Sequence, residues 1–170
     1  MIEMYHPEVK DCVANDVIGN QKVITGYNMS GKSTLLRTVG LMAYLHQIGM
    51  YVSANQAKLP IYQSIMGEFP RDYSEKDSTF TEHIKGISRM LKSEGVNLFL
   101  IDELCNSTNT EEGEEMGKII VNHLRKPLIS WMISTHFEHL SNQDTFHMDD
   151  YKLREGPCEG SKAIEFCKSI

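Results

Sequence analysis

The chain has 170 residues, of which 41% are hydrophobic and 24% are charged, a composition that fits one globular domain rather than a disordered or fibrous chain. No apolar stretch reaches the roughly 18 residues that a membrane-spanning helix needs, so we expect no membrane association. The net charge of −6 argues against this domain being a main nucleic-acid-binding surface, because phosphate binding requires clustered lysine and arginine side chains.

Short β-rich runs alternate with longer segments of helical spacing along the chain. In chain order, the pattern predicts a strand at 23–25, a helix at 33–48, a strand at 59–66, a helix at 79–92, a strand at 97–102, a helix at 111–124, strands at 128–134, 146–148 and 151–154, and a closing helix at 160–170. Such alternation is typical of a mostly parallel sheet with helices on its faces. The junctions at 20–22 and 147–150 are so abrupt that we expect loops to be missing there.

The four cysteines are Cys12, Cys105, Cys158 and Cys167, and no two of them form a C-x-x-C pair. This spacing argues against a structural zinc site. The acidic N-terminal segment is broken by Pro7 and does not resemble a signal peptide. We therefore expect reduced thiols and a cytoplasmic location, with a catalytic cysteine as an alternative.

Residues 26–33, GYNMSGKS, fit the phosphate-loop pattern G-x-x-x-x-G-K-[ST] and lie between a predicted strand and a predicted helix. The glycines allow the backbone amides to converge on phosphate oxygens, and the positive end of the following helix points at the same anion. Lys32 would then reach the β- and γ-phosphates of ATP, and the Ser33 hydroxyl would bind Mg²⁺. The alternative is a glycine-containing turn that matches the pattern by chance.

Two carboxylates, Asp102 and Glu103, follow the buried strand predicted at 97–102. The carboxyl ends of strands are where ligands bind in open α/β sheets, so we expect this pair beside the phosphate loop. Asp102 would hold Mg²⁺ through water, and Glu103 would polarise the attacking water as a general base. His136 follows another buried strand and would sense the γ-phosphate and help to place that water. The alternatives are a solvated strand end and a surface or helix-capping histidine.

Several segments together resemble the ATPase domain of the MutS family of DNA mismatch-repair proteins. They are TGYNMSGKST at 25–34, DSTF at 77–80, LIDEL at 100–104 with TNTEEG at 108–113, STH at 134–136 and AND at 14–16. The Asn-Met pair inside the loop, Asn28-Met29, is absent from generic phosphate loops. The order and spacing of these segments agree with the family from His6 to Ile170.

The resemblance implies a P-loop NTPase fold of the ABC-ATPase type over residues 1–170, which would be a fragment of a longer protein. It implies a homodimer or a MutS-like heterodimer with composite sites, in which Ser78 contacts the ATP of the partner. Asn15 and His147 would lie near the adenine. The remaining ATP contacts would come from the loop: Gly26, Tyr27, Asn28, Met29, Ser30, Gly31, Lys32, Ser33 and Thr34.

The function implied by the resemblance is an ATP-driven dimer switch that clamps DNA through domains absent from this chain. The chain departs from the family in three places. Residues 105–107 are Cys-Asn-Ser instead of Gly-Arg-Gly, and Cys12 occupies a position that is often aromatic. Residues 81–83, Thr-Glu-His, differ from the acidic pattern of the mismatch-recognising branch. One alternative is a MutS-like nucleotide-binding scaffold with little turnover and no mismatch recognition. Another is an ABC transporter ATPase subunit, whose LSGGQ-like signature is missing here. The helical histidines, His46 and His83 among them, show no metal-ligand spacing.

Overall fold

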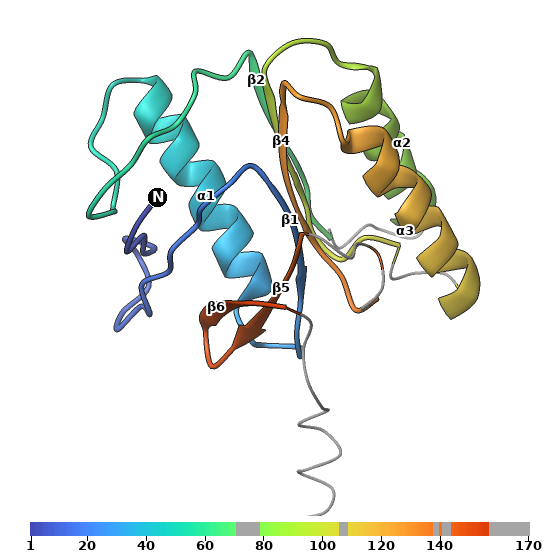
Figure 1. The fold of residues 1–170 in the computed structure, drawn as a ribbon, viewed down its shortest axis with the longest axis horizontal. Helices are drawn as coiled ribbons and strands as arrows, with labels where there is room; N and C mark the ends of the chain where they lie inside the picture. Colours follow the sequence, from blue (N-terminus) through green and yellow to red (C-terminus); the bar gives the residue numbers. More distant parts are fainter. Residues whose placement is uncertain (71–78, 106–108, 138–139, 141–143, 157–170) are drawn as a thin grey trace, which may run out of the picture.

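The computed structural model describes residues 1–70, 79–105, 109–137, 140 and 144–156. Six strands form one sheet in the order β2-β3-β4-β1-β5-β6 (Figure 1). The neighbouring strands are parallel except β6, which is antiparallel to β5. Their bounds are β1 Gln21–Thr25, β2 Ser64–Glu68, β3 Asn97–Ile101, β4 Ile129–Ser134, β5 Thr145–Asp149 and β6 Lys152–Glu155.

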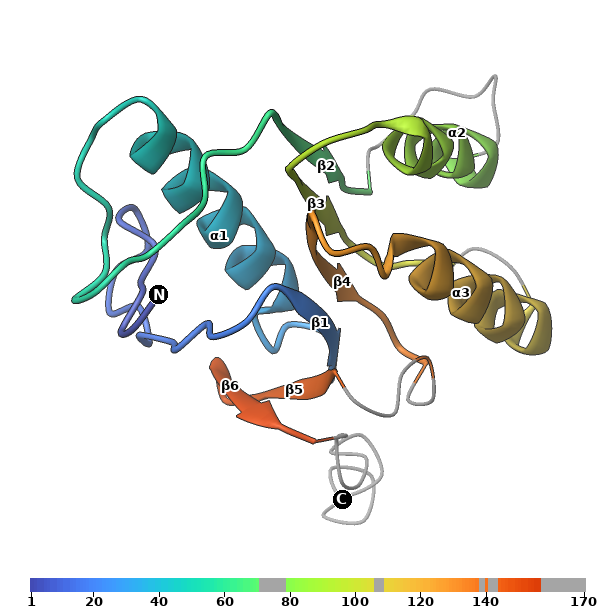
Figure 2. The same ribbon diagram turned by 45° about the horizontal axis from the view of Figure 1, so that its top comes forward.

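Helices cover both faces of this sheet. The helix α1 (Lys32–Gln47) lies on one face, and α2 (Thr79–Lys92) and α3 (Thr110–Leu124) lie side by side on the other (Figures 1 and 2). The predicted α/β class, with a mostly parallel sheet between helices, is therefore confirmed. No helix in the part of the chain described here is long and apolar enough to cross a membrane.

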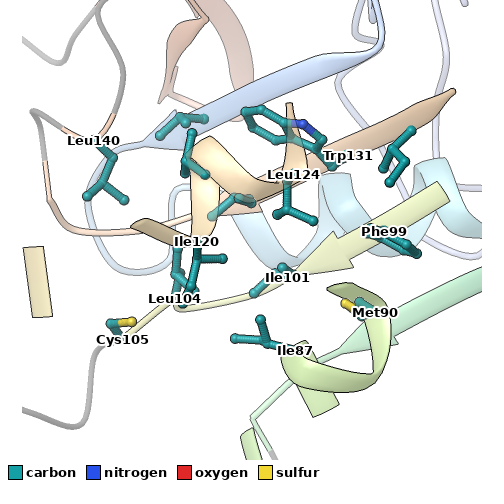
Figure 3. Packing of buried hydrophobic residues seen from close by; sticks show 14 residues of the cluster. Ile87, Met90, Phe99, Ile101, Leu104, Cys105, Ile120, Leu124, Trp131 and Leu140 are labelled. Atoms are coloured by element: carbon teal, nitrogen blue, oxygen red, sulfur yellow. The ribbon is translucent and has the colours of Figure 1, made fainter. Parts of the chain in front are cut away.

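The central strands are buried on both faces, which explains their unbroken apolar runs. Alternate side chains of β4 belong to different cores: Trp131 packs with α2 and α3, and Met132 packs with α1. Figure 3 shows the first of these cores, where Trp131, Phe99 and Leu124 meet between sheet and helices. Burying one such side chain stabilises the fold by roughly 1.5–3 kcal/mol.

The bounds of α1 follow from a glycine at each end. Gly31 precedes the helix with φ of 100°, and Gly49 follows it with φ of 77°. These left-handed conformations suit glycine. The Gly49 amide donates to the carbonyl of His46 at 3.1 Å, and this bond ends the helix. The prediction of a helix at 33–48 is confirmed to within one residue at each end.

The strand predicted at 59–66 is wrong in position, because β2 begins only at Ser64 and continues to Glu68. Pro60 has no amide to give to a strand ladder. The backbone of Tyr62 is held by the Gln47 side chain of α1, which accepts from its amide at 3.1 Å and donates to its carbonyl at 2.8 Å. The apolar residues before β2 therefore belong to a connecting segment.

The abrupt junction at 147–150 is a tight hairpin between β5 and β6. Asp149 pairs with Lys152, which leaves a two-residue loop of Asp150 and Tyr151, with φ of 44° and 64°. Positive φ at both loop residues is the geometry of a type I′ turn, which matches the twist of the strands. The predicted helix at 160–170 lies outside the described residues.

Candidate functional site

The phosphate-loop segment connects β1 to α1, and its glycines are required by close packing. Gly26 has φ of 133°, and a Cβ atom there would lie 2.8 Å from the Met148 carbonyl oxygen. Gly31 has φ of 100°, and a Cβ atom there would lie 3.0 Å from the Tyr151 ring. The β5–β6 hairpin therefore packs closely against the loop. A side chain larger than that of glycine would clash at these two positions.

Lys32 lies inside the curl of this loop. Its side chain is buried, and its Nζ donates to the carbonyl oxygens of Gly26 at 2.8 Å and Tyr27 at 2.7 Å. These bonds hold a positive charge at the N-terminus of α1, whose first turn contains no acidic residue and whose N-cap provides no side-chain hydrogen bond. The first amides of a helix and a buried ammonium group together form an anion-binding arrangement.

The Ser30 hydroxyl is a polar atom that the protein leaves unsatisfied. Ser30 is 9% exposed, and its Oγ is buried without a hydrogen-bond partner. An unsatisfied buried hydroxyl costs about 1–3 kcal/mol, and an oxygen of a bound phosphate would remove that cost. The residues around the loop therefore fit a phosphate group. Ser33 is half-buried, whereas Asn28 and Met29 are exposed.

The carboxylate pair lies at the end of β3, where Ser134 holds it. The Ser134 hydroxyl donates to Asp102 Oδ1 and accepts from the Glu103 amide at 2.9 Å. Asp102 and Ser134 are 2% and 0% exposed, so this contact is shielded from water. Glu103 has φ of 54°, which turns the chain sharply after Asp102. Ser134 was not predicted as a site residue, although its place at the end of a buried strand was a usable signal.

The strand that ends in the carboxylates, β3, is not the direct neighbour of β1, which leads into the phosphate loop. β4 lies between β1 and β3, and its last residue, Ser134, bridges the gap. The Thr135 amide donates to the Ile24 carbonyl at 3.0 Å, and the Leu104 amide donates to the Ser134 carbonyl at 3.0 Å. These bonds tie the ends of the three strands into one edge.

His136 follows β4 on this same edge and is exposed. Partial desolvation of its ring lowers the pKa of the imidazole and the Lys32 ammonium lowers it further, whereas the Glu103 and Asp102 carboxylates raise it. Charges influence one another in this way only at short range. The net effect lowers the pKa of His136, which favours its neutral imidazole at pH 7.

A cavity of about 320 Å³ lies next to the loop, between the start of α1 and the N-terminal segment. Its lining includes Gly31, Thr34 and Thr38 from the loop and helix, and Cys12 and Asn15 from the N-terminal segment. Cys12, which occupies the position expected to be aromatic in the family, thus faces a space adjoining the phosphate loop. Ligand pockets of small molecules begin at about this size.

Asn15 fastens the N-terminal segment to the β5–β6 hairpin. Its Nδ2 donates to the Tyr151 carbonyl at 2.9 Å, and its Oδ1 accepts from the Leu153 amide at 2.6 Å. Asn15 thus shapes the wall of the cavity. His147 is not among the residues that line this cavity, and its Nδ1 lies 3.0 Å from the Gly156 carbonyl oxygen. A place for His147 near an adenine remains a prediction, and Ser78 lies outside the described residues.

Comparison with known proteins gives consistent matches. The family model described as MutS domain V matches residues 22–169. Endonuclease MutS2 of Thermus thermophilus is 34% identical over 145 residues, which cover 80% of this chain and 19% of that protein. Endonuclease MutS2 of Streptococcus thermophilus is 32% identical over 193 residues, which cover 100% of this chain and 25% of that protein. The chain thus spans between 19% and 25% of the length of these relatives. It belongs to the MutS family.

Proposed function

We propose that this domain binds ATP with Mg²⁺ and hydrolyses the terminal phosphoryl group to water. The observation that carries the proposal is the phosphate loop, where the buried Lys32 ammonium and the unpartnered Ser30 hydroxyl meet at the N-terminus of α1. A polyanion is the ligand that satisfies a buried cation, a buried hydroxyl and the amides of a helix terminus at once.

The residues present also fit Mg²⁺, which would be held by the Ser33 hydroxyl and the Asp102 carboxylate. Magnesium prefers oxygen ligands and is bound by few protein groups, with phosphate and water completing its shell. The described residues contain no cluster of three or more His, Cys, Asp or Glu side chains that could hold a metal ion by themselves. When bound, the ion would neutralise charge on the phosphates.

Glu103 is the proposed general base, and His136 would orient the attacking water. The Ser134 hydroxyl holds the Glu103 amide, which fixes the start of the turn that presents its side chain. A neutral imidazole can accept or donate a hydrogen bond. Partial desolvation and the Lys32 ammonium lower the pKa of His136, and a lower pKa favours this neutral form. General-base catalysis contributes roughly 10²–10⁴-fold to a rate.

We further propose that the cavity lined by Cys12 and Thr34 takes the nucleobase, since it adjoins the phosphate loop. Resemblance to the MutS family supports an ABC-type arrangement in which two such domains form composite sites, with Ser78 acting on the partner's nucleotide. ATP would then close the dimer and hydrolysis would relax it, so that the whole protein clamps DNA through regions beyond this domain. The nuclease named in the MutS2 relatives is not assigned to any residue described here.

A second candidate function is a nucleotide-binding scaffold with little turnover. The observation that favours it is Cys105, which replaces a glycine of the family pattern and adopts φ of 58° in the turn after Glu103. A non-glycine residue in this conformation stores strain of about 1–3 kcal/mol. A turn altered next to the general base could slow the chemical step without affecting ATP binding.

Phosphate release measured on the 170-residue protein separates the two functions. Glu103→Gln should retain ATP binding and lose roughly 10²–10⁴-fold in turnover, because the amide keeps the size of the side chain and loses the base. The matched control is Glu112→Gln on the exposed side of α3, which should release phosphate at the normal rate. An inert parent protein that still binds ATP would establish the scaffold, and normal turnover in Glu103→Gln would remove Glu103 from its role.

A further inference from the structure

The β5–β6 hairpin forms one end of the sheet, and its position sets the space around the phosphate loop. It follows β1 in the strand order and lies near the start of α1 (Figure 2). The Met148 carbonyl oxygen is in close contact with Gly26, and the Tyr151 ring is in close contact with Gly31. Both hairpin residues also line the cavity beside the loop. A shift of the hairpin would therefore change the shape of the loop and of the cavity together.

A buried lysine of β1, Lys22, contacts the base of this hairpin. Lys22 is 3% exposed, and its Nζ lies 3.6 Å from the centroid of the Phe146 ring in β5. The segment before β1 covers the ammonium group, since a Cβ atom on Gly19 would lie 3.8 Å from Nζ. Within the described parts of the chain, this ammonium takes part in no hydrogen bond or ion pair. The face of the Phe146 ring is therefore the group that compensates its charge.

The register of the strands explains why these two side chains meet. Phe146 pairs with Ile24, and Lys22 lies two residues before Ile24, so its side chain projects from the same face of β1 as that of Ile24. Such diagonal neighbours are within reach of a long side chain and an aromatic ring. The Thr25 hydroxyl also donates to the Phe146 carbonyl at 3.2 Å. Both the backbone and the ring of Phe146 are thus attached to β1.

The contact between Lys22 and Phe146 is stronger than it would be at the surface. An aromatic ring carries partial negative charge on its faces, and its attraction for a cation increases when water is excluded. Lysine is almost never fully buried unless its charge is paired, because removing an ammonium group from water is costly. Loss of the ring would leave this buried charge uncompensated. Loss of the charge would leave an aliphatic chain that can still pack against the ring.

We propose, building on the ATP binding proposed above, that Lys22 is a positioning residue for the phosphate loop. Its ammonium group holds the Phe146 ring and thereby fixes the base of the β5–β6 hairpin against the loop. Asn15 fastens the tip of the same hairpin through the Tyr151 carbonyl, so the hairpin is held at both ends. Lys22 acts through the hairpin and does not touch the nucleotide.

Thermal unfolding of single and double variants tests whether the two side chains are coupled. Phe146→Leu should lower the Tm more than Lys22→Met, because it leaves the buried ammonium group without a partner. The double variant should unfold about 4–8 °C above the value that adding the two single effects gives. Phe146→Tyr keeps the ring and should stay close to the parent. Additive changes in Tm would overturn the pair.

Amide hydrogen exchange shows whether the hairpin itself loosens, and it requires no nucleotide. Lys22→Met should accelerate exchange in β5 and β6 by about tenfold, because local opening of the hairpin becomes easier. The amides of α2, on the opposite face of the sheet from α1, should exchange as in the parent. Unchanged exchange in β5 and β6 would overturn the proposal even if Phe146→Leu failed to fold.

Titration of Mg·ATP, at a temperature where every variant is folded, connects the hairpin to the loop. Lys22→Met should raise the Kd by roughly 3–10-fold, or about 0.7–1.4 kcal/mol. The matched control is Ile87→Val, which weakens the core between the sheet and α2 and should bind as the parent does. Equal affinity in Lys22→Met and the parent would overturn the positioning role. A parent that does not bind Mg·ATP would refute the proposed function, and the unfolding and exchange results would still decide whether Lys22 holds the hairpin.

Discussion

Replacing Ser134 with alanine should destabilise the domain more than any ordinary serine substitution. Its hydroxyl is fully buried, donates to Asp102 Oδ1 and accepts from the Glu103 amide. Alanine leaves both of these groups without that partner. A hydrogen bond to a charged group contributes about 1.5–3 kcal/mol, and an unsatisfied buried amide costs about 1–3 kcal/mol, so we expect a loss of roughly 3 kcal/mol.

Thermal unfolding followed by circular dichroism measures this loss. For a domain of this size, 1 kcal/mol corresponds to roughly 2–4 °C, so the Tm of Ser134→Ala should fall by about 6–12 °C. Ser130→Ala is the matched control, because Ser130 belongs to the same strand, is 9% exposed and has a side-chain hydrogen bond with the Tyr62 hydroxyl. We expect that control to cost about 1 kcal/mol. Equal Tm values for the two variants would refute the inference that Ser134 holds the carboxylate edge.

Two further predictions concern Cys105 and Ser78. Burial raises the pKa of the Cys105 thiol to about 11 from 9.0, so the folded state retains its proton between these values while the unfolded state loses it, and stability falls as the pH rises through this window. Urea unfolding at pH 8, 9, 10 and 11 should therefore show the parent losing stability relative to Cys105→Ala, and parallel curves would contradict this. Ser78→Arg should spare ATP binding yet abolish phosphate release, and mixing it with a Lys32→Ala subunit should restore part of the activity, since the mixed dimer holds one intact composite site. A mixture that stays inactive, or a Ser78→Arg protein that is active alone, would rule out action in trans.

Most of the fold could be predicted from local sequence patterns. The helix at 79–92 was predicted with its exact ends, and the strands β3 and β4 within one residue, because their apolar residues are periodic or continuous. β2 was misplaced because its boundary depends on Gln47, a residue of α1 that captures the backbone of Tyr62. No local pattern reports a contact of this kind.

The candidate site shows the same division between local and long-range information. The phosphate loop and the carboxylates could be predicted because each is a compact motif beside a strand end. The contribution of Ser134 depends on strand order, which places β4 between β1 and β3. Residues that act through neighbouring elements were therefore missed.

The central claim is that the loop around Lys32 binds the phosphates of ATP, and a titration of Mg·ATP into the Glu103→Gln background tests it most directly. The matched variants are Lys32→Ala and Lys126→Ala, the second removing an exposed lysine far from the loop. The ammonium group faces a polyanion in a partly closed site, where charge interactions are worth several kcal/mol, so Lys32→Ala should weaken binding by at least about tenfold. Lys126→Ala should bind as the parent does. Equal affinity in all three proteins would contradict the assignment of this loop as the nucleotide site.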